Sequence, residues 1–159
     1  MKGSIAAVCL SLTACSGSEA NQFDTTLSRQ QVMKHVINPA AVSLWTRVEM
    51  NGGDSGPAYL TPTLEADWLA AENEAAIVAE GGNLLLLPGR AVQAGEHDEW
   101  AKFARALTAK ALAVKAATAA RDGEKMFQAG ADLYQACSDC HAKFYIPYLK
   151  PDGSFAPPS

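Results

Sequence analysis

Apolar residues at helical spacing are the feature that most constrains what this chain can fold into. Four stretches place them three or four positions apart, which lines up one face of an α-helix. Alanine is abundant, β-branched residues are sparse, and no stretch alternates apolar and polar residues with period two. These features predict an all-α protein, and 159 residues are enough for one domain with a buried core. The residues expected to face inward are Met33, Val36, Ile37, Ala40, Leu44, Val48, Leu64, Trp68, Ala71, Ala75, Val78, Trp100, Phe103, Leu107, Ala111, Val114, Phe127, Gly130, Tyr134, Cys137 and His141.

Turn-forming residues separate the four stretches. Asparagine, glycine, aspartate, serine and proline cluster over residues 51–57 and predict a loop, while Gly81-Gly82 predicts a helix end. Pro39 falls inside the first stretch and is expected to bend that helix or to start a second segment. The expected helices cover residues 26–50, 61–82, 98–121 and 123–147. We therefore expect an antiparallel four-helix bundle over residues 25–148, followed by a flexible tail over 149–159.

The N-terminus has the pattern of an export signal. Ile5 to Ala14 form a short apolar run after one lysine, too short for the ~20 residues of a membrane-spanning helix. The run ends in Leu12-Thr13-Ala14-Cys15, which resembles the lipobox of bacterial lipoproteins. On this interpretation residues 1–14 are a signal peptide, Cys15 is the lipidated N-terminus and residues 15–24 are a tether. The alternative is an ordinary signal peptide cut after Ala20, with Cys15 discarded.

Export and charge limit the location and the partners. Both alternatives predict a protein of the bacterial periplasm. Ser16 directly after Cys15, in place of aspartate, resembles lipoproteins sent to the outer membrane, so the lipid would anchor the domain there. The 13 lysines and arginines against 17 aspartates and glutamates give a net charge of −4, which argues against nucleic-acid binding because that needs a basic footprint.

A short motif with two cysteines indicates which cofactor the protein binds. Cys137 and Cys140 remain for the folded domain, and Cys137-Ser138-Asp139-Cys140-His141 is a C-x-x-C-H string, the attachment motif of haem c. On a helix, positions i, i+3 and i+4 share one face, so both sulfurs and the imidazole point the same way. We expect one haem c bound through Cys137 and Cys140, with His141 ligating the iron. The alternatives are a thioredoxin-like dithiol, which requires a βαβ context, and half of a zinc site, which lacks a second ligand pair.

A four-helix bundle with C-x-x-C-H on its last helix resembles class II cytochromes c, the cytochrome c prime family, over about Thr25 to Tyr148. In that family the first helix often carries an Arg-Gln pair, and the side chain above the iron lies three residues beyond the glutamine. Here the pair is Arg29-Gln30, so the resemblance implies Met33 as the sixth iron ligand. Members with methionine there resemble low-spin electron carriers, whereas members with an aliphatic residue are five-coordinate.

The role of Met33 therefore distinguishes between the two functional alternatives. As an iron ligand it implies an electron carrier. As ordinary core packing it leaves an open site, which suits a haem protein that binds nitric oxide or carbon monoxide. His35 is the competing ligand, but two residues turn a helix by ~200°, so Met33 and His35 cannot both face the haem. We expect His35 on the solvent side with Gln31 and Asn38, and His97 in a solvated polar loop.

The remaining expectations concern the surroundings of the haem. Arg29 and Arg90 are candidate contacts for the haem propionates, although exposed arginines are commoner. Three tryptophans are expected to pack around the haem, and two tyrosines to cover its edge or end the last helix: Trp45, Trp68, Trp100, Tyr145 and Tyr148. No catalytic residue set stands out, so we expect an electron carrier rather than an enzyme, with peroxidase-like activity a weaker alternative. Class II cytochromes c are often homodimers through their first two helices; the residues leave the oligomeric state and the redox partner open.

Overall fold

A computed structural model of the chain describes residues 23–47, 50–53, 56–59, 62–91 and 95–145. The expected signal peptide, Cys15 and the C-terminal tail lie outside the described residues, as do Val48, Pro147 and Tyr148. None of the helices in the described ranges is long and apolar enough to cross a bilayer.

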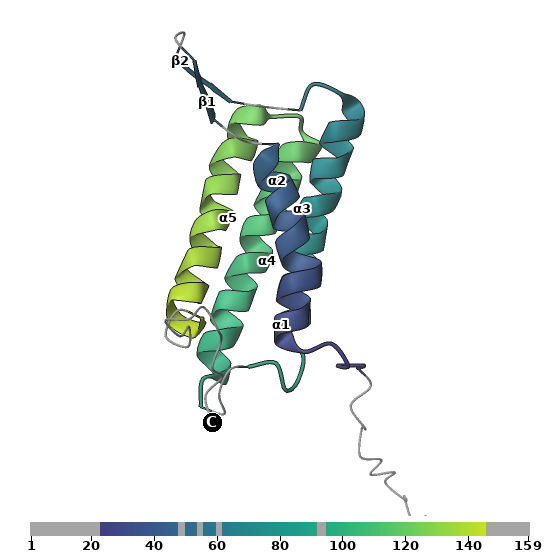
Figure 1. Cartoon of the computed structure of the whole chain (residues 1–159), viewed down its shortest axis with the longest axis vertical. Helices are drawn as coiled ribbons and strands as arrows, with labels where there is room; N and C mark the ends of the chain where they lie inside the picture. The colour runs from purple at the N-terminus through teal and green to yellow at the C-terminus, as the bar shows by residue number, and fades with distance from the viewer. Residues whose placement is uncertain (1–22, 48–49, 54–55, 60–61, 92–94, 146–159) are drawn as a thin grey trace, which may run out of the picture.

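The elements follow one another as four helical rods with one hairpin. In chain order they are α1 (Arg29–Val32), the π-helical turn η1 (Met33–Ile37), α2 (Asn38–Thr46), β1 (Met50–Gly53), β2 (Gly56–Tyr59), α3 (Glu65–Leu85), α4 (His97–Ala119) and α5 (Gly123–Phe144). Because α1, η1 and α2 are continuous, we call residues 29–46 the N-terminal helix. The rods run alternately up and down beside one another (Figure 1). The expected helical bundle is confirmed.

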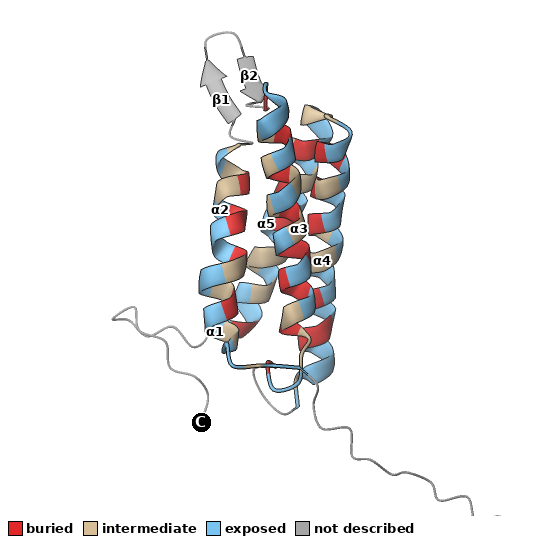
Figure 2. Ribbon diagram, turned by 90° about the vertical axis from the view of Figure 1, so that its right-hand side faces the viewer, coloured by how far each residue is buried: buried red, intermediate tan, exposed pale blue. Residues whose placement is uncertain are grey.

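The packing of the rods is uneven. Close backbone approaches link the N-terminal helix to α3, α3 to α4, and α4 to α5, whereas α5 stands off from the N-terminal helix. Buried side chains occupy the faces that the rods turn toward one another (Figure 2). The predicted inward residues that are buried are Ile37, Ala40, Leu44, Trp68, Ala71, Ala75, Val78, Trp100, Leu107, Ala111, Val114 and Gly130.

Side-chain caps fix the start of the first and last rods. The Ser28 hydroxyl accepts from the Gln31 backbone N–H at 3.2 Å, and the Gln31 amide oxygen accepts from the Ser28 N–H at 2.8 Å. This capping box begins the helix at Arg29, three residues after the predicted start. Asp122 caps α5 by accepting from the Lys125 N–H at 3.0 Å, at the turn where the sequence predicts the helix to begin.

The bounds of α3 correct two predictions. The helix begins at Glu65 rather than at residues 61–63, and Leu64 lies in extended backbone before it. Leu64 is therefore off the helical face and 64% exposed, instead of facing inward. The predicted end at Gly81-Gly82 is also wrong, because α3 continues to Leu85.

Close helix packing explains the two glycines inside α3. A Cβ at Gly81 would collide with the Ile37 side chain of the N-terminal helix. A Cβ at Gly82 would lie 2.9 Å from the Ala104 carbonyl oxygen of α4. Both positions are buried, so the glycines admit neighbouring helices on two sides rather than ending the helix.

Part of the predicted loop at residues 51–57 belongs to the antiparallel strands β1 and β2 instead. Met50 pairs with Tyr59 and Gly53 with Gly56. Glycine, asparagine and proline are depleted in strands, so composition predicted a loop. Residues 50–53 and 56–59 nevertheless pair in a short ladder.

The inward face of α5 differs from the predicted stripe. The buried residues are Met126, Gly130, Leu133 and Phe144, whereas Tyr134 is 62% exposed and His141 is also exposed. The reason is that α5 packs mainly against α4, so only the stripe facing α4 is fully covered. The neighbouring stripe, with Tyr134, Cys137 and His141, faces the space between α5 and the N-terminal helix.

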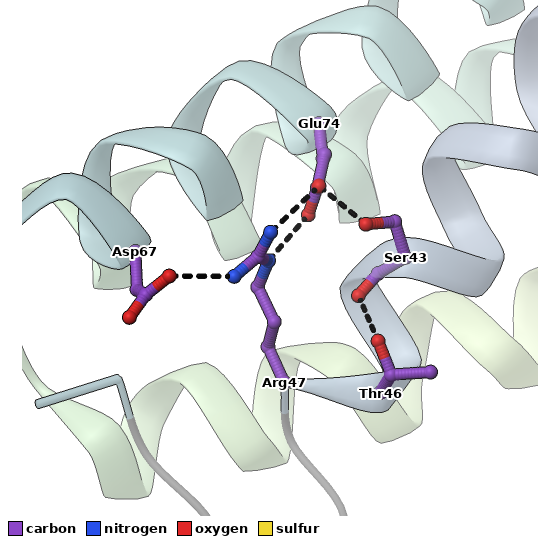
Figure 3. Close-up of polar contacts among 5 residues, drawn as sticks. All are labelled: Ser43, Thr46, Arg47, Asp67 and Glu74. Carbon is purple, nitrogen blue, oxygen red and sulfur yellow. Dashed lines mark hydrogen bonds and ion pairs between the residues drawn. The ribbon is translucent and has the colours of Figure 1, made fainter.

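An ion-pair network ties the N-terminal helix to α3 (Figure 3). Arg47 lies between two carboxylates, with Nη1 at 3.1 Å from Asp67 Oδ1 and Nε at 3.2 Å from Glu74 Oε2. The Ser43 hydroxyl also donates to Glu74 Oε1 at 2.5 Å. The hydrogen bond to Glu74 is the main reason that the pKa of Arg47 is raised. The network holds the end of the N-terminal helix on α3.

Candidate functional site

A cavity of about 660 Å³ lies between the N-terminal helix and α5, with α4 behind it. Its volume lies within the range of ~300–1,000 Å³ typical of ligand pockets. Among the described residues that line it, two have a lysine or arginine side chain, Arg29 and Lys34, and none has a carboxylate side chain. Six aromatic side chains form much of its wall: Trp45, Trp100, Phe103, Tyr134, Phe144 and Tyr145. The cavity therefore suits a ligand with a large apolar body and negative charge at one edge.

The C-x-x-C-H motif forms the α5 side of this cavity. Cys137, Cys140 and His141 all line it, as their i, i+3, i+4 spacing predicts. Both cysteines are partly buried, and their thiols are free. The His141 ring lies beside the Tyr145 ring, with centroids 5.5 Å apart. Two thiols and an imidazole are thus presented together from one helix.

The surroundings hold these three groups in their neutral forms. Burial raises the pKa of the Cys137 thiol, and burial together with Cys137 raises the pKa of Cys140 to about 11. His141 is partly exposed, and desolvation of its imidazole by the surrounding protein lowers its pKa. At neutral pH the imidazole is therefore uncharged, which is the form that ligates a metal ion.

Met33 lines the cavity from the opposite side, on the π-helical turn. The N-terminal helix presents residues at four-residue intervals to the cavity: Arg29, Met33, Ile37, Ala41 and Trp45. In a regular α-helix each such step advances about 40° beyond a full turn, so the four steps from Arg29 to Trp45 would carry the series well around the rod. The π-helical turn has more residues per turn, so each of its residues rotates the chain less about the helix axis. The series therefore stays on the cavity side.

The other candidate histidines lie elsewhere. His35 is exposed and does not line the cavity, and the His97 side chain is 76% exposed. The exposure of both side chains confirms the sequence-based predictions, but His97 is the first residue of α4 rather than part of a loop. Asn38, expected beside His35 on the solvent side, is exposed but also lines the cavity.

Trp45 and Trp100 line the cavity, but Trp68 does not. Trp68 packs under Arg121, whose guanidinium carbon is 5.9 Å from the ring centroid. The tryptophan prediction is therefore wrong for Trp68.

The two candidate arginines occupy different positions. Arg29 lines the cavity, and its Nη1 donates to the Ala91 carbonyl at 3.2 Å while the guanidinium stands 5.7 Å from the Trp100 ring centroid. Arg90 does not line the cavity; it is 5% exposed and donates to the Leu84 and Leu27 carbonyls at 2.7 and 3.2 Å. Arg90 thus fastens the α3–α4 connection to the start of the N-terminal helix.

Phe144 and Lys34 are among the residues of the cavity lining that were not predicted from the sequence. Phe144 is 5% exposed and meets Trp100 and Phe103 edge to face, at centroid distances of 5.2 and 5.6 Å. Its position four residues after Cys140 is a helical spacing that could have revealed it. Lys34 also lines the cavity, but a lysine lies outside the apolar pattern from which inward faces are predicted.

Comparison with family models, with curated proteins and with solved structures finds no match to this chain. In the part of the chain that the structure describes, no three His, Cys, Asp or Glu side chains converge as the ligands of a metal ion do. The function is therefore inferred from the geometry of the cavity and from the C-x-x-C-H motif on its wall.

Proposed function

We propose that this protein is a c-type cytochrome of the class II kind, with one covalent haem in the cavity between the N-terminal helix and α5. Cys137 and Cys140 would hold the haem by thioether bonds, and His141 would ligate its iron. The proposal is supported most by one observation: the C-x-x-C-H side chains and Met33 line opposite sides of the same cavity.

The lining of the cavity fits such a group. Aromatic and aliphatic side chains cover its walls, which suits a flat macrocycle. Arg29 on the lining, and the absence of carboxylates among the described lining residues, suit the two carboxylate groups of a haem. Arg90 does not line the cavity, whereas Arg29 does, so Arg29 is the better candidate of the two.

The function that we propose is electron transfer. A bound haem supplies one-electron redox chemistry through its iron. Met33 would be the second residue to ligate the iron, and a thioether ligand would favour the ferrous form and raise the reduction potential. The apolar walls limit access of water to the iron. The alternative is a gas-binding haem protein with Met33 not bonded to iron, and the spectrum of the protein distinguishes the two.

We further propose that the protein is exported to the bacterial periplasm and held at the outer membrane by a lipid on Cys15. The support is the lipobox-like sequence that ends at Cys15. Lipid and haem would then occupy different cysteines.

Covalent attachment is tested with the wild type, two single cysteine variants and their double variant, produced with a cytochrome c maturation system. Haem should remain with the wild-type polypeptide through acid-acetone extraction and denaturing electrophoresis. Cys137→Ala or Cys140→Ala should mature poorly, and the double variant should hold no covalent haem. Ser138→Ala is the matched control, because it changes the same turn without removing a thiol. Freely extractable haem in the wild type would refute the proposal.

A further inference from the structure

The N-terminal helix changes its geometry at the residue proposed to reach the iron. Residues 33–37 form η1, a π-helical turn, in which the Asn38 N–H donates to the Met33 carbonyl. Pro39 follows within the first turn of α2, where a proline ring disfavours the normal α-helical bond to the preceding turn. Single π-helical turns inside helices are often found at functional sites. The position of Met33 therefore depends on how this turn is held.

A contact with α3 holds the turn. Ile37, the last residue of η1, is 5% exposed and lies directly over Gly81. A Cβ at Gly81 would lie 3.0 Å from Ile37 Cδ1 and closer still to Cγ1. Real Cβ atoms do not tolerate such an approach, so only glycine leaves room for Ile37 to rest against the α3 backbone.

We propose that Gly81 and Ile37 are positioning residues for Met33. Ile37 lies four residues after Met33 on the same rod, and both line the cavity. How deeply Ile37 sits over Gly81 sets how far the π-helical turn stands from α3. That in turn sets how far Met33 stands from His141 on α5. This inference rests on the proposed function for its spectroscopic readout, but the contact itself is independent of the haem.

The next residue of α3 provides a matched control. A Cβ at Gly82 would meet Thr108 Oγ1 and the Ala104 carbonyl, both on α4. Gly81→Ala and Gly82→Ala thus add the same methyl group to neighbouring buried positions of one helix. Both should lower stability by overpacking, but only Gly81→Ala pushes on the turn that carries Met33.

The experiment compares wild type, Gly81→Ala, Gly82→Ala and the double variant Gly81→Ala/Ile37→Ala as holoproteins. We measure the weak far-red absorption band of sulfur-to-iron ligation and the rate of carbon monoxide uptake by the ferrous protein. Gly81→Ala should lose most of the band and take up carbon monoxide several-fold faster. Gly82→Ala should keep both properties at the wild-type level, and the double variant should recover the band because it regains the lost space.

A readout independent of ligation is the methyl resonance of Met33, labelled with carbon-13, together with amide exchange over residues 33–38. Both should change in Gly81→Ala and stay unchanged in Gly82→Ala. If Gly81→Ala does not fold, Ile37→Ala tests the same contact without overpacking and should also weaken the band and shift the resonance.

The outcomes separate the two claims. A wild type without the far-red band contradicts Met33 ligation, and the resonance and exchange data then decide the positioning role alone. Equal effects of Gly81→Ala and Gly82→Ala on the resonance, or no effect of Gly81→Ala, would overturn the positioning role even if the haem is bound as proposed.

Discussion

Trp45 and Tyr134 meet edge to face across the cavity, with ring centroids 6.1 Å apart and ring planes inclined by 73°. Trp45 lies on α2 and Tyr134 on α5, two helices whose backbones stand apart. The contact therefore joins the two sides of the cavity through side chains alone. Because Tyr134 is 62% exposed, this junction lies at the surface.

Removing this junction should open the cavity while leaving the bundle folded. Tyr134→Ala loses an aromatic pair, which is worth about 0.5–1.5 kcal/mol, so the free energy of unfolding in denaturant should fall by that amount. Small external ligands should reach the site faster, measured as carbon monoxide uptake by the ferrous protein. Tyr134→Phe retains the ring and should behave like the wild type; a stability loss as large as that of the alanine variant would show that the hydroxyl, not the ring contact, matters.

The Arg47 network should matter more than an ordinary surface pair. Arg47→Met leaves Glu74 without its guanidinium, and the Glu74 side chain is only 15% exposed. We expect a loss of about 1–2 kcal/mol in the free energy of unfolding, between the values for exposed and for buried charged hydrogen bonds. The control is Lys110→Met, which removes the pair with Asp132, whose side chains are 45% and 61% exposed. It should cost at most about 1 kcal/mol, and equal losses in the two variants would contradict a special role for Arg47.

Met33→Leu decides between electron carrier and gas binder. A thioether bond must break before an external ligand binds, so we expect a low-spin wild type with slow carbon monoxide uptake. Met33→Leu should be high-spin, bind carbon monoxide more readily and have a lower reduction potential. The fold should survive, because leucine and methionine have similar volumes and such exchanges usually cost less than about 1.5 kcal/mol.

The matched control for Met33 is His35→Ala, two residues along the same turn. His35 is exposed and does not line the cavity, so its removal should leave the absorption spectrum unchanged. A high-spin wild type in which Met33→Leu has no spectral effect would favour the gas-binding alternative over the carrier.

Lipidation is tested by location. If Cys15 carries a lipid, the exported protein should partition into detergent and resist salt washing, whereas Cys15→Ala should be released as a soluble periplasmic protein. Residues 16–24 span at most about 30 Å when extended, so the bundle would lie close to its membrane. A mature N-terminus at Asn21 would contradict the lipid anchor and support cleavage after Ala20.

Helical spacing predicted the rods and most of the core because burial follows the periodicity of the helix. It failed where contacts between residues distant in the sequence determine a helix end or the exposure of a side chain. Gly81-Gly82 has the local signature of a helix end, but its function in packing depends on Ile37 and Ala104, which are distant in the sequence. Likewise, the exposure of Tyr134 follows from the gap beside α5, which no local pattern records.

The candidate site likewise contains residues that the sequence predicted and residues that it did not. The spacing of Cys137, Cys140 and His141 was enough to predict that they share one face, because all three lie on one helix. On the opposite side of the cavity, periodicity placed Met33 on the inward face, but its role as an iron ligand came from a family resemblance. Lys34 was missed because a charged residue lies outside an apolar stripe.

The most direct test of covalent haem attachment is the intact mass of the mature protein, purified after coexpression with a cytochrome c maturation system. We predict a mass equal to that of the processed polypeptide, with its lipid if Cys15 is modified, plus one haem. Digestion should place that added mass on the peptide containing Cys137 and Cys140. A polypeptide mass with no haem, and with the two cysteines recovered as free thiols or as a disulfide, would contradict the proposed function.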